Sequence, residues 1–256
     1  MEYLVIAIIA VIAYLLGSIN TSIIVSKIKG TDIREHGSGN AGLTNTLRTF
    51  GKGAALIVLI GDLLKGVIAI LLAKIVMNKF AANEILKMNM SDVSQLDIGL
   101  MIKLANLKLL AIQISGIAVV LGHIFPVFYK FKGGKGAAVV YGMFMVADPL
   151  LGLFIFIGGF IYLLIFDYAA VVSFAMITIF TAVEATQMGI RGEGNIVISC
   201  LLFAIFCLVW FAHRQNIFRL LVGKENKVNF RASFAKHKKK KQLKQEIKRK
   251  NSNEMG

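Results

Sequence analysis

The sequence predicts an all-α protein that crosses a membrane several times. Hydrophobic residues occupy 57% of its 256 positions, whereas ordinary soluble domains contain about 45–50% apolar residues. Mean hydropathy is +0.72, and long apolar runs recur along the chain. Each run is near the length of about 20 residues that a helix needs to span the hydrocarbon. Basic residues gather between these runs, so the pattern is typical of a polytopic membrane protein.

The apolar runs predict about seven transmembrane helices. They occupy residues 3–26, 54–77, 104–128, 137–166, 168–190 and 195–212. The run at 137–166 is too long for one ordinary span, and Asp148-Pro149 should end or kink a helix inside it. We therefore expect two helices there. The first, at 137–147, would rise only about 16 Å, and such a short helix usually lines a cavity.

The net charge of +15 is unevenly spread and predicts the orientation. The stretch from Arg214 to the C-terminus holds fourteen Lys and Arg against three Glu, and further basic clusters lie at 27–52 and 130–135. The loop at 78–103 is nearly balanced. Because basic loops stay in the cytoplasm, we expect these clusters and the C-terminus on the cytoplasmic side of the cell (plasma) membrane. The N-terminus would then lie on the outer side. An odd number of spans agrees with this orientation.

Two regions are expected along the chain. Residues 1–230 would form the membrane domain, and residues 231–256 a basic cytoplasmic tail with a run of four lysines at 238–241. Such a tail suits a solvated segment near anionic membrane lipids. No aromatic interleaving or nucleic-acid-binding fold accompanies the charge, so nucleic acid is not expected as a partner.

The stretch from His36 to Arg48 is the first motif that could carry chemistry. Glycine lets the backbone approach a ligand and adopt positive φ, and loop amides, hydroxyls and a guanidinium suit an anion, phosphate above all. If a helix begins after Gly42, Thr44 and Arg48 share a face, and Arg48 could grip a phosphate in a bidentate way. The candidate residues are Gly37, Ser38, Gly39, Asn40, Thr44, Asn45 and Arg48.

A second motif runs from Gly122 to Ala137. Its spacing is not that of a Walker loop, but its glycines precede a predicted helix whose N-terminal amides favour an anion. The candidates are Gly133, Gly134, Lys135 and Gly136. Two anion-binding loops on one membrane face indicate two phosphate groups or one large anion. His123, in the same motif, is interpreted as a packed histidine rather than a catalyst.

Two further groups of polar residues lie within a predicted span or at its end. His213 and Asn216 are three apart where the last span ends, and can face one pocket. Asp62 and Lys65 lie inside the second span, where charges are costly and usually paired or functional; their spacing permits mutual pairing, and substrate binding is an equal alternative. The four histidines and few carboxylates form no ligand-spaced cluster, so we expect no metal and no cofactor.

At residues 36–48, 62–66, 122–137 and 213–227 the chain resembles the bacterial membrane glycerol-3-phosphate acyltransferases that use acyl phosphate as donor. The resemblance extends from about residue 15 to 230. It implies about seven helices, some short or broken, around a cytoplasm-facing polar groove. It also implies transfer of a fatty acyl chain from acyl phosphate to the 1-hydroxyl of glycerol 3-phosphate, giving 1-acylglycerol 3-phosphate and phosphate in phospholipid synthesis.

The resemblance also assigns residues. It implies catalytic roles for Ser38, Arg48, Lys135, His213 and Asn216. The substrate-binding positions would be Gly37, Gly39, Asn40, Thr44, Asn45, Gly133, Gly134 and Gly136. Three positions depart from the family pattern: Asn20 replaces a proline, Val139 a threonine and Ala170 a serine. The basic tail is a candidate docking element for the soluble enzyme that makes acyl phosphate.

An acyl phosphate is already activated, so the protein needs no covalent nucleophile. It must orient the hydroxyl and stabilise charge on the carbonyl oxygen and departing phosphate. Arg48 and Lys135 are expected to hold phosphate, while His213 or the donor's own phosphate takes the proton. The His-x-x-x-x-Asp signature of another acyltransferase class is absent. The rival interpretation is a transporter of a phosphorylated metabolite, which would also need basic cavities and broken helices.

Overall fold

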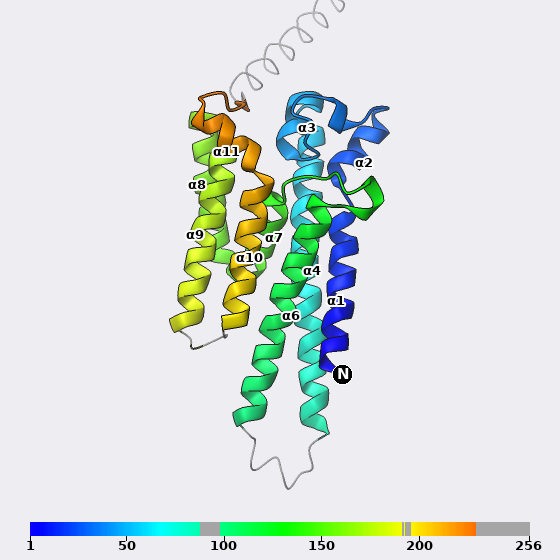
Figure 1. Ribbon diagram of the computed structural model, residues 1–256, viewed down its shortest axis with the longest axis vertical. Coiled ribbons are helices and arrows are strands. Elements are labelled where there is room, and N and C mark those ends of the chain that lie inside the picture. The colour runs from blue at the N-terminus through cyan, green and yellow to red at the C-terminus, as the bar shows by residue number, and fades with distance from the viewer. Residues whose placement is uncertain (88–97, 191, 193–195, 229–256) are drawn as a thin grey trace, which may run out of the picture.

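The computed structural model describes residues 1–87, 98–190, 192 and 196–228, and every regular element in these ranges is a helix. The tail at 231–256 lies outside them. Figure 1 shows a bundle with the N-terminus at one end and α2, α3 and α11 at the other. The helices are α1 (Glu2–Ser18), α2 (Thr21–Ile28), η1 (Ile33–Glu35), α3 (Leu43–Phe50), α4 (Lys52–Leu86), α6 (Ile98–Ile124), η2 (Val127–Tyr129), α7 (Ala137–Ala147), α8 (Pro149–Phe166), α9 (Ala169–Ile190), α10 (Ile196–Ala212) and α11 (Arg214–Leu221).

The predicted class is confirmed, and the count of seven spans is approximate. Within the described residues, five helical segments are long and apolar enough to cross a membrane, or six when the pair α10–α11, bent by 58°, counts as one span. The short helix α7, 11 residues long, supplies the seventh predicted segment. As expected, the break between α7 and α8 falls at Asp148-Pro149, where Asp148 Oδ1 accepts the Leu151 N–H at 2.9 Å and caps α8.

The connection between α4 and α6 is shorter than the loop expected at 78–103. Helix α4 continues to Leu86 and α6 begins at Ile98, so both ends of this stretch are helical. Lys79, Ala82 and Glu84 favour helix. Such residues can therefore extend an apolar span beyond the hydrocarbon.

The first span is broken near its end, where small and polar residues interrupt the apolar run. Asn20 lies between α1 and α2, fully buried, and its Oδ1 accepts the Ile23 N–H at 3.0 Å as an N-cap. Its Nδ2 donates to Ala41 O at 3.3 Å. This residue stands where the resembled family has proline, and here it both starts a new helix and holds the following loop.

Close helix contacts at glycines assemble the centre of the bundle. A Cβ at Gly17 would lie 2.2 Å from Val119 O on α6, and one at Gly142 would lie 2.1 Å from Leu63 O on α4. Small residues of this kind let helices approach closely in a membrane. Helix α7 therefore packs against α4 near the middle of the molecule.

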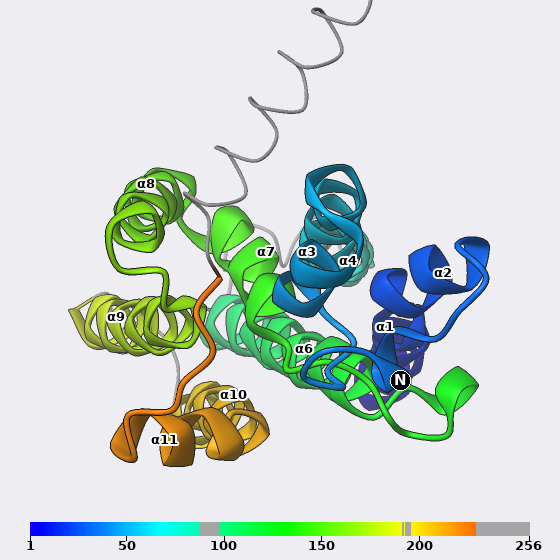
Figure 2. The same cartoon turned by 90° about the horizontal axis from the view of Figure 1, so that it is seen from above.

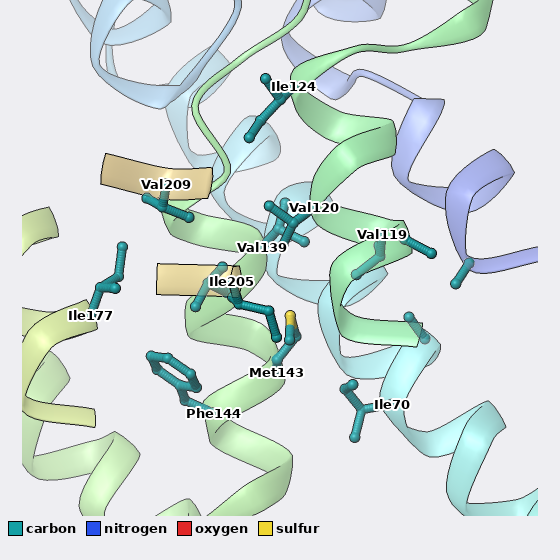
Figure 3. Packing of buried hydrophobic residues seen from close by; sticks show 14 of the residues in the cluster. Ile70, Val119, Val120, Ile124, Val139, Met143, Phe144, Ile177, Ile205 and Val209 are labelled. Carbon is teal, nitrogen blue, oxygen red and sulfur yellow. The ribbon is translucent and has the colours of Figure 1, made fainter. Parts of the chain in front are cut away.

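The largest apolar cluster surrounds α7. Figure 3 shows Val139, Met143 and Phe144 of α7 facing Ile177 of α9 and Ile205 of α10. In the view of Figure 2, α7 lies between α8 and α9 on one side and α3 and α4 on the other, while α10 lies beside α6. Helix α7 thus lies at the centre of the bundle, and Asp148-Pro149 ends it short of a full span.

Candidate active site

A cavity of about 650 Å³ lies at the α3 and α11 end of the bundle. It is bordered by the first motif, the second motif and a third motif, residues 213–227. It brings together nine of the predicted site residues, while Gly37, Gly39, Gly133 and Gly134 shape the backbone nearby. The nine are Ser38, Asn40, Thr44, Asn45, Arg48, Lys135, Gly136, His213 and Asn216. Residues from segments almost 180 positions apart therefore meet at one place.

The first motif is organised by Asn45. This side chain is 1% exposed, and its Oδ1 accepts the Ser38 N–H at 3.0 Å, while Nδ2 donates to Ile33 O at 3.1 Å and His36 O at 2.8 Å. Gly37 has φ of +57°, and a Cβ there would lie 2.3 Å from Asn45 Oδ1. Asn45 thus fixes the loop that presents Ser38 at the exposed rim of the cavity.

Helix α3 begins after Gly42, which was the condition for Thr44 and Arg48 to share a face, and carries both residues into the cavity wall. Arg48 reaches the C-terminal segment of the described chain: its Nη2 donates to Asn226 O at 2.9 Å and its Nε to Lys227 O at 3.2 Å. Burial lowers the pKa of the Arg48 guanidinium, although an arginine remains protonated in proteins. A positive charge is therefore held at the cavity in a fixed orientation.

The second motif folds back on the end of α6. The Gly133 and Gly134 N–H groups donate to Ile124 O at 3.1 Å and His123 O at 3.0 Å. A Cβ on Gly133 would lie 2.1 Å from His123 O, so the close approach requires glycine. Gly136, with φ of +84°, then starts α7.

Lys135 extends from this loop into the cavity. Its Nζ donates a short hydrogen bond to Asn216 Oδ1. Burial, and next the nearby charge of Arg219, lower the pKa of Lys135 to about 8. The ammonium is thus charged near neutral pH, and it loses its proton more readily than a solvated lysine does.

His213 and Asn216 occupy the bend between α10 and α11. His213 Nδ1 lies 2.8 Å from Val209 O. Because a carbonyl can only accept, Nδ1 carries the proton and Nε2 is left as an acceptor in the neutral ring. Asn216 Nδ2 donates to Glu225 Oε1 at 2.7 Å. Because the Glu225 carboxylate binds the amide nitrogen, the amide oxygen of Asn216 points toward Lys135.

Glu225 and Arg219 belong to the site although neither was a sequence candidate. Arg219 Nε donates to Glu225 Oε2 at 3.0 Å, which completes a chain from Lys135 through Asn216 and Glu225 to Arg219. Both residues lie within the third motif, where Glu225 is a single acid among basic residues. That isolation was the available signal, and only the fold shows that it faces Asn216.

Asp62 and Lys65 pair with each other, as one of the two alternatives predicted. Asp62 Oδ1 and Lys65 Nζ are 2.8 Å apart, and both side chains are buried. His123 is packed as expected, with Nδ1 2.8 Å from Lys65 Nζ. Asp62 and His123 also border the cavity.

The rest of the cavity wall is largely apolar. It comes from α4, α7, α8 and α9 and includes Tyr141, Phe156, Phe160 and Met176. Of the two departures on these helices, Ala170 borders the cavity, whereas Val139 is fully buried in the core and does not. The cavity is consequently cationic at its motif end and apolar along α8 and α9.

This geometry defines a class: an integral membrane protein whose cavity has cationic side chains at one end and an apolar wall along the rest. A model of a protein family described as glycerol-3-phosphate acyltransferase matches residues 7–223. The chain belongs to this glycerol-3-phosphate acyltransferase family, and acylation of glycerol 3-phosphate in phospholipid synthesis is its activity.

Named relatives agree with the family. A glycerol-3-phosphate acyltransferase of Thermoanaerobacter pseudethanolicus is 38% identical over 220 residues, covering 86% of this chain and 93% of the relative. The crystal structure of PlsY (YgiH), an integral membrane glycerol 3-phosphate acyltransferase, in its glycerol 3-phosphate form is 30% identical with a TM-score of 0.66. Its lysophosphatidic acid form gives a TM-score of 0.64, and both cover 87% of this chain and 94% of theirs.

Proposed function

We propose that this protein transfers a fatty acyl group from an acyl phosphate to the 1-hydroxyl of glycerol 3-phosphate. The observation that carries the proposal is the cavity itself, in which Arg48 and Lys135 border one end and aromatic side chains of α8 the other. Such a cavity suits an acyl phosphate, whose anionic head and apolar tail match these two ends. Glycerol 3-phosphate, the substrate that the family implies, brings the second phosphate.

Acyl transfer then needs only orientation and charge stabilisation. The hydroxyl oxygen of glycerol 3-phosphate bonds to the acyl carbon, the bond from that carbon to the phosphate oxygen breaks, and phosphate leaves with the electron pair. Arg48 and Lys135 bind the phosphates, assisted by Ser38 and the loop amides, and so stabilise the negative charge on the leaving group. Asn40 and Thr44 contribute polar contacts to the substrate.

Two groups are candidates to accept the proton of the attacking hydroxyl. His213 Nε2 is one, because the Val209 carbonyl holds the ring in the tautomer that leaves this nitrogen free. The donor's phosphate is the other, which would make catalysis substrate-assisted. If His213 is the base, His213→Gln lowers kcat by about 100-fold or more, in the range of general-base catalysis. Turnover near that of the parent would assign the proton to the donor.

The donor is tested with purified protein and two competing acyl sources. Palmitoyl phosphate and palmitoyl-CoA are each supplied with glycerol 3-phosphate, and 1-acylglycerol 3-phosphate is measured as product. We expect product from palmitoyl phosphate and none above background from palmitoyl-CoA. Turnover with palmitoyl-CoA alone would overturn the donor assignment and leave the family activity intact.

A further inference from the structure

Three ionisable side chains lie together beneath the second motif. Asp62 and Lys65 of α4 and His123 of α6 are 2%, 4% and 3% exposed. Lys65 Nζ is 2.8 Å from both Asp62 Oδ1 and His123 Nδ1, and the latter two atoms are 3.7 Å apart. Ionisable groups in spans are expensive to bury. A compact cluster of three therefore calls for an explanation beyond helix packing.

The cluster reaches the break in the first span. Lys65 Nζ also donates to Ile19 O at 3.1 Å, directly before Asn20, and Thr21 Oγ1 donates to Asp62 Oδ1 at 3.4 Å. Asn20 in turn holds Ala41 O in the first motif. One hydrogen-bonded path thus runs from the cluster to the first phosphate-binding loop.

His123 extends the cluster to the second loop. A Cβ on Gly134 would lie 2.1 Å from His123 Nε2 and 2.7 Å from Ala41 O, so the two loops meet at the edge of this ring. An ammonium can only donate. Lys65 therefore keeps Nδ1 of His123 as an acceptor, which places the ring proton on Nε2 and fixes the ring's orientation beside Gly134.

We propose that Asp62, Lys65 and His123 are positioning residues that set the spacing between the two phosphate-binding loops. Lys135 follows Gly134 directly, so a shift of the ring moves the Lys135 backbone relative to the first loop. The inference rests on the proposed function, and it assigns to the cluster the binding of glycerol 3-phosphate rather than of the acyl chain.

A role in helix packing alone makes a different prediction. Removing one member of a buried ion pair leaves an uncompensated charge and destabilises the protein, whereas replacing both members with neutral groups is often harmless. If the cluster serves only stability, the paired replacement restores everything. If it positions the loops, the paired replacement restores stability and leaves substrate binding impaired, because the contacts to Ile19 O and to the His123 ring remain lost.

The experiment compares Asp62→Asn, Lys65→Met and the double variant with the parent protein in detergent. Melting temperature reports stability, and KM is measured separately for glycerol 3-phosphate and palmitoyl phosphate. Lys74→Met is the matched control, since Lys74 is also on α4 and its Nζ donates to a backbone carbonyl, Val146 O, at 3.0 Å. It does not border the cavity.

We expect both single variants to melt lower and the double variant to melt near the parent. The double variant should keep a KM for glycerol 3-phosphate raised by about tenfold, a coupling typical of residues in contact. The KM for palmitoyl phosphate should rise by less, by about threefold at most, because the apolar wall of the cavity also holds its acyl chain, and kcat should stay near the parent value. Lys74→Met should leave both KM values unchanged. A double variant with parental KM values, or equal KM shifts for both substrates, would overturn the proposal. If the parent itself fails to use palmitoyl phosphate, the proposed function fails instead; melting shifts with glycerol 3-phosphate then still test the cluster.

Discussion

Single side chains act at this site either by holding a loop or by facing the cavity. Asn45 belongs to the first kind, because its amide groups are engaged by Ser38, Ile33 and His36. The resemblance implied that Asn45 binds substrate, and because Asn45 also borders the cavity this role stays a prediction. Its partners in the loop could not be predicted, because composition does not show where an amide finds them. Arg48 and Lys135 belong to the second kind: both long cations border the cavity, and their binding of phosphate stays a prediction.

Arg48 should be intolerant even of a conservative change. We predict that Arg48→Ala lowers kcat/KM by about 100-fold and that Arg48→Lys recovers little, because an ammonium cannot make the two parallel hydrogen bonds of a guanidinium. Initial rates over a range of glycerol 3-phosphate concentrations measure the effect. Parental rates in Arg48→Lys would show that a point charge suffices.

Substrate affinity should depend on pH through Lys135, whose pKa burial lowers to about 8. Below this pH the ammonium is charged and binds phosphate; above it the charge is lost. The KM for glycerol 3-phosphate should therefore rise by about tenfold for each pH unit above the pKa.

The matched variant is Lys135→Arg, which stays protonated throughout this range. Its KM should vary little between pH 7 and pH 9.5, whatever its absolute value. A parental KM that is constant over the same interval would assign the phosphate contact to another group.

Among the helices, α7 is the one whose first and last residues the local sequence predicted best. Asp148-Pro149 marks its end, and glycines precede its start. The break at Asn20 was not predicted, although Ser18, Asn20 and Thr21 interrupt the apolar run there, because small polar residues can also pack inside a span. The contact of Asn20 with Ala41 becomes visible only in the fold. Pairing of distant elements, such as α11 with the loop before α7, likewise has no local signal.

The contact between α7 and α4 should be sensitive to one methyl group. A Cβ at Gly142 would lie 2.1 Å from Leu63 O, whereas one at Gly158 on α8 meets nothing within 4 Å. We predict that Gly142→Ala destabilises the protein by about 1–3 kcal/mol through overpacking. Gly158→Ala should be neutral or slightly stabilising. Thermal unfolding in detergent compares them, and equal melting temperatures would contradict the close packing.

At the scale of the whole molecule, the motifs meet although they are spread over most of the chain. Figure 1 places α3 and α11 at the end of the bundle that lies away from the N-terminus. Apolar runs and charge asymmetry were enough to predict a bundle with the motifs on one face. The C-terminal contacts were missed, because Arg48 binds only backbone carbonyls of Asn226 and Lys227, which any sequence supplies.

The charge pattern predicts that this motif end faces the cytoplasm. In a background with Cys200 and Cys207 replaced by Ser, Lys87→Cys should react with a membrane-impermeant maleimide on intact cells. Lys27→Cys should react only after lysis. Both positions are exposed, at the end of α4 and on α2 respectively. The reverse labelling pattern would invert the orientation.

Direct transfer without a covalent intermediate is the centre of the proposed mechanism, and one measurement addresses it. Purified protein is mixed with palmitoyl phosphate, with and without glycerol 3-phosphate, and inorganic phosphate and 1-acylglycerol 3-phosphate are followed through the first turnover. We predict equal amounts of both products, and phosphate release only when glycerol 3-phosphate is present. A burst of phosphate, stoichiometric with protein in the absence of glycerol 3-phosphate, would reveal an acyl-enzyme and contradict direct transfer.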